Sequence, residues 1–244
     1  MCMAIYKPKG VQIAKEYLKN SFRENHDGAG FAIARNAEVK CFKGFFKFGD
    51  FWKAFKPYQN EAAVIHFRWA THGEKNGDNC HPFLVCGGNM AVVHNGIIDI
   101  KTDGKKSDTA TFCELVIEPI LKQGVSPKCG AFRYLIETSI GAGNKIVMLL
   151  RDGKAIIFNE KQGVWHNGAW FSNEGFKNSR PTFDWMFPEF KCQSPVKITH
   201  GERFPDYEPG GERDADEADR AYYKAHGFAE SEIDEIIKGT SYDA

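Results

Sequence analysis

The chain has 244 residues, of which 42% are hydrophobic and 26% charged, an ordinary globular composition and enough for one large domain, or one domain with a small appendage. The formal net charge of zero argues against a general nucleic-acid binder, and no apolar run approaches the roughly 20 residues of a membrane-spanning helix. A charge and a proline interrupt the N-terminal segment, so it lacks the apolar stretch of a signal peptide. The seven cysteines are an odd number and include no C-x-x-C pair, which is typical of reduced thiols. We therefore expect a cytoplasmic protein.

The first half of the chain has the patterns of short strands and two helices. Alternating or β-branched apolar residues predict strands at residues 4–6, 31–35, 39–46, 62–69, 83–86 and 90–94. Apolar residues at helical spacing predict helices at residues 11–22 and 50–58.

The second half begins with helices and returns to strands. Ser107 can cap a helix that runs to about residue 122, and a second helix fits residues 131–140. A strand meander is expected over residues 145–150, 155–159, 164–166 and 169–172. Strands, two helices and strands again predict an α+β protein in which two sheets pack together and helices lie outside.

Acidic residues gather near the end of the chain. Residues 196–244 carry 13 acidic and 6 basic side chains. We therefore expect one domain at residues 1–195 and an acidic tail at 196–244, with short helices at 214–225 and 230–238. These helices either pack on their own domain or dock a partner.

Cys2 is the first residue suited to catalysis. Methionine aminopeptidase generally removes Met1 when the next side chain is as small as cysteine, which leaves Cys2 with a thiol and a free α-amine. An α-amine titrates near pH ~8, so it can act as the general base for the thiol of its own residue. Taken alone, a cysteine at this position is more often inert.

Two further segments have suitable chemistry. Arg68 follows an apolar segment and precedes a polar loop, and its planar guanidinium suits bidentate capture of a carboxylate. Asn95 and Gly96 end another strand, where an amide side chain and a backbone N–H can form an oxyanion hole. An Asn-Gly pair can also be a simple hairpin turn.

Together, residues 66–98 closely resemble the glutaminase domain of glucosamine-6-phosphate synthase, a class II glutamine amidotransferase. That family has the Arg-Trp-Ala-Thr-His-Gly run that starts here at Arg68, the Asn-x-His-Pro that starts at Asn79 and the Val-His-Asn-Gly-Ile-Ile that starts at Val93. Weaker matches are Asp27-Gly28-Ala29-Gly30, Ser107-Asp108-Thr109 and Ser172-Asn173-Glu174. The resemblance covers about residues 2–175.

The resemblance implies an α+β fold of the N-terminal nucleophile hydrolase type, a four-layer αββα sandwich. It also implies that Cys2 is the nucleophile and its own amine the base, while Asn95 and the N–H of Gly96 form the oxyanion hole. Glutamine is the implied substrate, and no metal or other cofactor is implied. The residues implied to bind glutamine are Arg68 for the α-carboxylate, helped by Thr71 and His72, Asp108 for the α-ammonium group, and Trp69, which shapes the pocket.

The chain departs from the family pattern at two positions. Met3 stands where the family usually has glycine after the nucleophile, and Ala110 stands where Ser-Asp-Thr often continues with glutamate. Met3 can change the backbone geometry beside Cys2. Ala110 removes one side-chain contact of the helix that Ser107 caps.

Competing interpretations of the motif region are weaker. Its histidines, His66, His72, His81 and His94, do not have the spacing of a usual zinc site. Basic and aromatic residues between positions 40 and 56 are more typical of a solvated hairpin than of a nucleic-acid site. Two alternatives remain: a non-catalytic, partner-binding relative of the fold, and an N-terminal-cysteine hydrolase that acts on another amide.

Amidotransferases of this class hand ammonia to a synthase. About 70 residues follow the last motif, too few for a sugar-isomerase domain. We therefore expect a separate synthase protein as partner, or free ammonia as the product.

Overall fold

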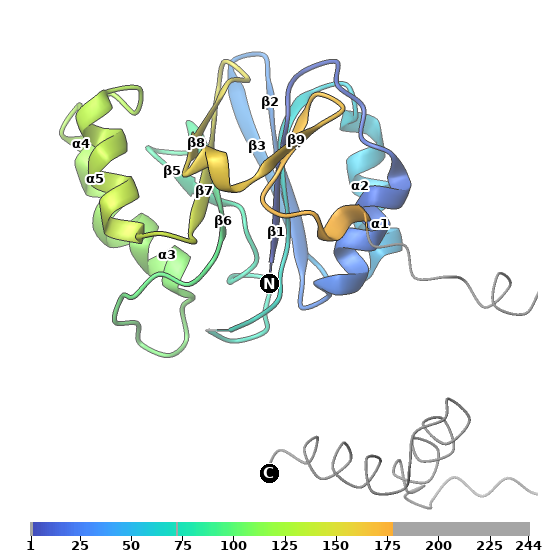
Figure 1. The fold of residues 1–244 in the computed structure, drawn as a ribbon, viewed down its shortest axis with the longest axis horizontal. Coiled ribbons are helices and arrows are strands. Elements are labelled where there is room, and N and C mark those ends of the chain that lie inside the picture. The colour runs from blue at the N-terminus through green and yellow to red at the C-terminus, as the bar shows by residue number, and fades with distance from the viewer. Residues whose placement is uncertain (1, 72, 178–244) are drawn as a thin grey trace, which may run out of the picture. The chain divides into compact units, whose positions relative to one another are not determined.

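A computed structural model describes residues 2–71 and 73–177 (Figure 1). The chain divides into two units, Met1–Met186 and Phe187–Ala244, and all described residues belong to the first. The expected helices at 214–225 and 230–238 lie outside the described residues, as does the rest of the acidic tail.

Two antiparallel sheets form the centre of the described unit. The six-stranded sheet has the order β3-β2-β4-β1-β10-β9 and the four-stranded sheet the order β5-β6-β7-β8. The strands of the first sheet are β1 (Met3–Lys7), β2 (Ala29–Arg35), β3 (Glu38–Phe45), β4 (Ala62–Phe67), β9 (Val164–His166) and β10 (Ala169–Phe171). Those of the second are β5 (Phe83–Val85), β6 (Met90–Asn95), β7 (Lys145–Leu150) and β8 (Ala155–Phe158).

Helices cover the outer face of each sheet (Figure 1). The six-stranded sheet carries α1 (Lys15–Glu24), α2 (Phe48–Phe55) and the short 3-10 turns η1 (Lys56–Tyr58) and η4 (Gly175–Lys177). The four-stranded sheet carries α3 (Asp108–Phe112), a π-helical turn η2 (Cys113–Ile117), α4 (Glu118–Lys122) and α5 (Gly130–Ile140); a further 3-10 turn, η3 (Glu160–Gln162), precedes β9. The expected α+β fold, a four-layer αββα sandwich, is confirmed.

Two helices differ from the sequence prediction in physically interpretable ways. Helix α1 begins at Lys15 and not near residue 11, because the backbone at Ala14 is extended. The helix capped by Ser107 is present, and the Ser107 hydroxyl accepts a hydrogen bond from the backbone N–H of Ala110 at 3.2 Å. It contains a π-helical turn before Pro119, which lacks an N–H and whose ring would clash with the carbonyl four residues earlier in a regular α-helix.

The expected meander over residues 145–172 is wrong in its topology. β7 and β8 form a hairpin in the four-stranded sheet, whereas β9 and β10 pair with each other and join β1 in the other sheet. Each segment is a strand as expected, but local alternation does not specify which sheet a strand joins. Within the described ranges, no helix has the length and apolar character needed to cross a bilayer.

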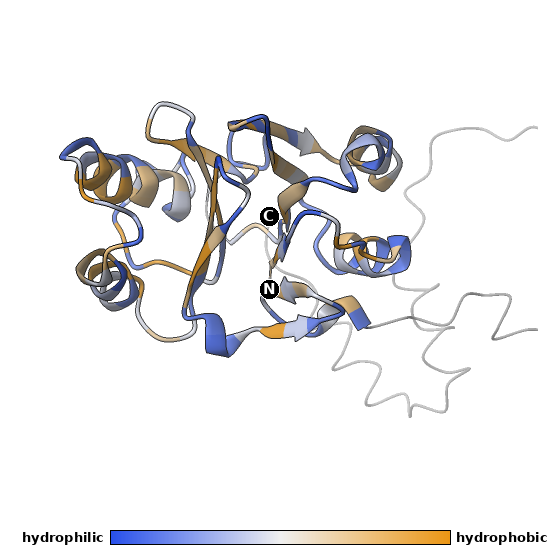
Figure 2. Ribbon diagram, turned by 90° about the horizontal axis from the view of Figure 1, so that it is seen from above, coloured by the Kyte–Doolittle hydropathy of each residue, from blue (hydrophilic) through white to orange (hydrophobic). Residues whose placement is uncertain are grey.

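Side-chain alternation places three apolar layers between the four structural layers. Figure 2 shows apolar residues concentrated on the strands and on the helix faces turned toward them. The middle layer, between the sheets, contains alternate residues of each strand, such as Ala4 and Tyr6 of β1 and Val147 and Leu149 of β7. Because side chains two residues apart share a face, Cys2, Asn95 and Lys145 also point between the sheets, at one end of the sandwich.

Candidate active site

Cys2 lies where β1 begins, beside the end of β4. Met3 pairs with Phe67 in the sheet, so the chain leaving β4 passes next to the thiol. The Trp69 backbone N–H donates a hydrogen bond to Cys2 Sγ at 3.2 Å, and the thiol can donate to the Trp69 carbonyl at 3.3 Å. The sulfur is thereby held by the first residues of the loop that follows Arg68.

The surroundings of the thiol keep it protonated at rest. Burial raises the pKa of Cys2, while the hydrogen bond from Trp69 and the positive charge of Arg68 act in the opposite direction. Since the net effect on the pKa is upward, the thiol requires a base before it can attack a carbonyl group.

A small pocket of about 270 Å³ opens directly on the thiol. Its wall contains Cys2, Trp69 and Thr71 from one sheet and its following loop, and Gly96, Ile97 and residues 142–144 from the other. Trp69 and Ile97 are each about half exposed, so they form the apolar rim of the pocket.

Asn95 does not line this pocket, but it contacts the backbone of the cysteine that does. Its Nδ2 donates to the Cys2 carbonyl, which also accepts a hydrogen bond from Asn173 Nδ2 at 3.0 Å. Asn95 is fully buried at the end of β6. The two amides therefore fix the backbone of the residue that bears the thiol.

Gly96 occupies a backbone conformation that suits only glycine. Its φ is +141°, and a side chain at this position would collide with Asn144. Asn144 is itself held by His94, whose ring bridges Asn144 Oδ1 at 2.9 Å and Thr109 Oγ1 at 2.8 Å. The peptide after Asn95 is thus packed against a buried polar network.

The two charged residues expected to bind an amino acid, Arg68 and Asp108, are both buried. Arg68 donates from Nη1 to the Glu74 carbonyl at 2.9 Å. The Asp108 carboxylate accepts from the backbone N–H groups of Ile98 at 2.8 Å and Thr109 at 2.7 Å. Their charges act on Cys2 with opposite sign, since Arg68 lowers and Asp108 raises the pKa of the thiol.

The predicted residues therefore gather at one end of the sandwich. Cys2, Trp69, Thr71 and Gly96 line the pocket, Asn95 contacts the Cys2 backbone, and Arg68 and Asp108 hold the adjoining loops. His72 lies outside the described residues.

Buried histidines support the site from the interior. The His66 and His81 rings are in contact, with centroids 3.9 Å apart and planes tilted by 53°, and His66 Nε2 lies 2.9 Å from the His94 carbonyl oxygen. Burial lowers the pKa of His66 to about 3, and it lowers the pKa values of His81 and His94 as well, so all three rings are neutral at neutral pH. Over the ranges that the structure describes, no group of His, Cys, Asp and Glu side chains is arranged to hold a metal ion.

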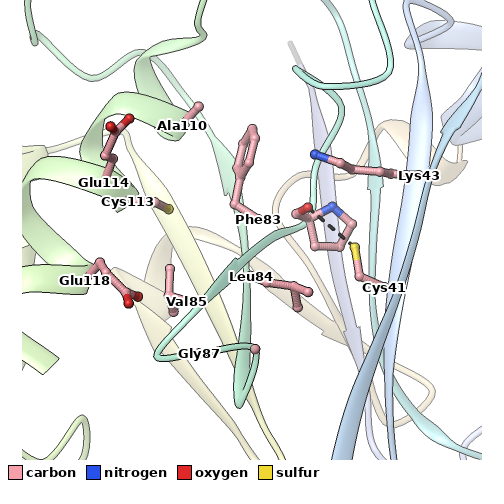
Figure 3. Close-up of a pocket in the computed structure, with 12 residues that line it drawn as sticks. Cys41, Lys43, Phe83, Leu84, Val85, Gly87, Ala110, Cys113, Glu114 and Glu118 are labelled. Carbon is pink, nitrogen blue, oxygen red and sulfur yellow. Dashed lines mark hydrogen bonds between the residues drawn. The ribbon is translucent and has the colours of Figure 1, made fainter. Parts of the chain in front are cut away.

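A larger cavity of about 630 Å³ lies elsewhere, between β3, β5 and the helix that starts at Asp108 (Figure 3). Lys43 projects from one wall and Glu114 and Glu118 from the other. These charged groups have partners of their own: Lys43 donates to the Asp78 carbonyl at 2.9 Å, and Glu114 accepts from Lys106 at 2.6 Å. None of the predicted site residues lines this cavity, and we do not assign it to catalysis.

Sequence reasoning missed two residues of the site, Asn144 and Lys145. Asn144 directly precedes β7, and Lys145 is its first residue and lies directly opposite Asn95 in the sheet register. Their neighbours in the sequence, Gly141 to Gly143, indicate only a turn before a strand. The one available signal was the presence of Lys145 at the start of an otherwise apolar strand.

No protein-family model matches the chain. The glutamine–fructose-6-phosphate aminotransferase (isomerizing) of Sulfurisphaera tokodaii is 31% identical over 167 residues, which make up 63% of this chain and 28% of the relative. That of Shewanella oneidensis is 34% identical over 161 residues, 60% of this chain and 26% of the relative.

This chain resembles the class II glutamine amidotransferases. It spans less than a third of the length of the two curated relatives described above.

Two solved structures were also matched. The glutamine phosphoribosylpyrophosphate amidotransferase of B. subtilis has 15% identity and a TM-score of 0.46, with 70% of this chain and 40% of that chain covered. A glutamine aminotransferase class-II domain protein of Silicibacter pomeroyi has 13% identity and a TM-score of 0.38, with 70% and 87% covered.

Proposed function

We propose that the chain is a glutaminase that hydrolyses the side-chain amide of glutamine through a thioester on Cys2 and releases ammonia. The observation that carries the proposal is the meeting of Cys2, Gly96 and the rim residue Trp69 around one small pocket, with the Asn95 amide hydrogen-bonded to the Cys2 carbonyl. The names of the curated relatives, which are glutamine aminotransferases, support the choice of substrate.

The first half-reaction forms the thioester. After removal of Met1, the α-amine of Cys2 takes the proton of the thiol, and the thiolate sulfur attacks the amide carbon of glutamine. The new C–S bond forms as the C=O π electrons move to oxygen. Collapse of this tetrahedral species breaks the C–N bond, and the α-ammonium group returns its proton to the leaving nitrogen, which departs as ammonia.

The second half-reaction restores the enzyme. The α-amine takes a proton from water, the hydroxide adds to the thioester carbon, and the C–S bond breaks to give glutamate and the Cys2 thiol. In both halves, negative charge develops on the former amide oxygen. Asn95 Nδ2–H and the Gly96 N–H are the proposed donors, and loss of one such donor typically costs about 3 kcal/mol of barrier.

Recognition of the amino acid is assigned to the groups around the pocket. Arg68 binds the α-carboxylate with its planar fork, assisted by Thr71 and His72, and Asp108 binds the α-ammonium group. Trp69 closes the side of the pocket. One cation and one anion held apart are what a zwitterionic substrate requires, and the opposite effects of Arg68 and Asp108 on the thiol support their closeness to the reacting atoms.

We further propose that the ammonia passes to a separate synthase, and that the acidic tail either packs on its own domain or docks this synthase. Residues 196–244 have more than twice as many acidic as basic side chains, which would steer them toward a basic partner surface. In this proposal, residues 1–195 form the amidotransferase domain.

The test is glutamine turnover by protein with a native N-terminus. Wild type should convert glutamine to glutamate and ammonia in equal amounts, and Cys2→Ala should abolish this while the melting temperature persists. Cys129→Ala is the matched control, because Cys129 is an exposed cysteine before α5. Equal turnover by wild type and Cys2→Ala would refute the assignment, and no turnover of glutamine would favour the non-catalytic relative or, if another amide is cleaved, the other amidohydrolase.

A further inference from the structure

Lys145 is a buried lysine at the catalytic end of the sandwich. It opens β7, only 7% of its surface is exposed, and its side chain points between the two sheets. Its Nζ lies 3.4 Å from Asn95 Oδ1 and 3.2 Å from the Gly143 carbonyl oxygen. Burying an ammonium group is unfavourable unless its donors are used, so this placement calls for a functional reason.

The two neighbours of the Asn95 amide determine which way it faces. On one side is the Cys2 carbonyl, which can only accept, and on the other is the Lys145 ammonium group, which can only donate. The amide must therefore turn Oδ1 to Lys145 and Nδ2 to Cys2. Without the ammonium group, the side chain loses the interaction that distinguishes its two ends.

We propose that Lys145 is a positioning residue for the oxyanion hole, which holds the Asn95 amide with its N–H groups toward the reacting carbon and adds a positive charge behind them. The inference rests on the proposed glutaminase function and assigns a residue to it. Nδ2 carries two hydrogens, one of which binds the Cys2 carbonyl, so the second remains for the substrate oxygen. A donor polarised by a neighbouring cation is a stronger hydrogen-bond donor in a water-poor site.

Asn144, the residue before Lys145, supports the second proposed donor of the oxyanion hole, the N–H of Gly96. Asn144 packs against Gly96 and is anchored by His94. The Asn144-Lys145 pair thus supports both proposed donors, from a strand that lies 50 residues further along the chain than β6.

The charge of Lys145 also gives the proposal a pH signature. Burial lowers the pKa of Lys145 below its ordinary value. The ammonium form is present below that pKa and is lost as the pH rises through it. Turnover should accordingly fall on the alkaline side, earlier than an exposed lysine would cause.

The experiment compares Lys145→Met and Lys145→Arg with the wild type in steady-state glutamine hydrolysis. Lys145→Met should lower kcat about 10- to 100-fold with KM changed less than about threefold, because the oxyanion forms only after binding. Lys145→Arg should recover a substantial part of kcat. The alkaline fall of kcat in the wild type should be absent from Lys145→Met.

Lys7→Met is the matched control. Lys7 is also buried and also donates to a backbone carbonyl, that of Glu61, but it ends β1 at the opposite end of the sandwich. This variant should lose stability and keep kcat. If Lys145→Met is too unstable to assay, Lys145→Leu carries the same expectation, because its side chain likewise has no group that can donate to Asn95 Oδ1.

A double-mutant cycle separates positioning from general packing. In an Asn95→Ala background, Lys145→Met should change kcat less than about twofold, since the group it positions is gone. A kcat of Lys145→Met within twofold of the wild type, or full additivity with Asn95→Ala, would overturn the proposal. If the wild type does not hydrolyse glutamine, the proposed function itself fails and this assignment falls with it.

Discussion

The conformation of Gly96 yields a quantitative prediction for Gly96→Ala. At φ +141° an alanine is strained by about 1–3 kcal/mol. Its methyl group would also displace Asn144, and loss of the buried bond between Asn144 and His94 costs about 1–3 kcal/mol more. We therefore expect the free energy of unfolding to fall by about 2–6 kcal/mol, a large share of the stability of an ordinary domain.

Gly124→Ala isolates the contribution of the collision. Gly124 also has a positive φ, +78°, but a methyl group there would meet no atom within 4 Å. Its cost should be limited to about 1–2 kcal/mol of backbone strain. Urea unfolding of both variants gives the two free energies, and a glutaminase assay under native conditions gives kcat.

Activity should distinguish the two glycines further. Gly96→Ala should lower kcat by at least about 100-fold, the effect typical of a lost oxyanion donor, whereas Gly124→Ala should leave kcat unchanged. Equal destabilisation by the two substitutions, together with full turnover by Gly96→Ala, would show that Gly96 is neither constrained by Asn144 nor part of the hole.

Three further predictions concern other parts of the chain. Arg68→Lys should raise KM for glutamine about tenfold with little change in kcat, because lysine cannot reproduce the bidentate fork; an unchanged KM would mean that another residue holds the carboxylate. Unfolding free energy should fall as the pH drops from 6.5 toward 3, by up to ~1.4 kcal/mol per pH unit for His66, because the unfolded state binds a proton that the buried ring does not. His66→Gln should have a shallower slope than the wild type, with the remaining slope due in part to His81 and His94, and an unchanged slope would exclude His66 as a source of the pH dependence. Deleting residues 214–244 should separate the two alternatives for the tail. If the tail docks a synthase, glutamine hydrolysis and the melting temperature should be unchanged while ammonia transfer fails, whereas marked destabilisation of the truncated protein would mean that the segment packs on its own domain.

Much of the fold was predictable because strand alternation is a local property. The segments around Cys2, Arg68 and Asn95 are strands or strand ends as the sequence indicates. Period-two patterning also determines which residues share a face, so the meeting of Cys2 and Asn95 follows once the sheets are stacked. The start of α1 and the π-helical turn before Pro119 depend on backbone details that periodicity does not contain.

The rest of the site could not be predicted because it depends on pairings distant in the sequence. Lys145 meets Asn95 through a strand register that joins residues 50 positions apart. Nor does the sequence show that β9 and β10 cross to the other sheet, since both sheets accept short apolar strands. The hydrogen bonds of Arg68 and Asp108 to neighbouring backbone groups likewise follow from loop geometry, which side-chain chemistry alone does not specify.

The most direct test of Cys2 as the N-terminal nucleophile is covalent labelling with an electrophilic glutamine analogue, such as a diazoketone. The product is examined by intact-mass and peptide analysis. We expect one adduct per chain, on the N-terminal peptide, with Met1 absent and the label on the Cys2 sulfur. An excess of glutamine should prevent labelling, and Cys2→Ala should abolish it. An adduct on another cysteine that glutamine does not compete away, or full glutamine turnover by protein that retains Met1, would contradict the assignment of Cys2 as an N-terminal nucleophile.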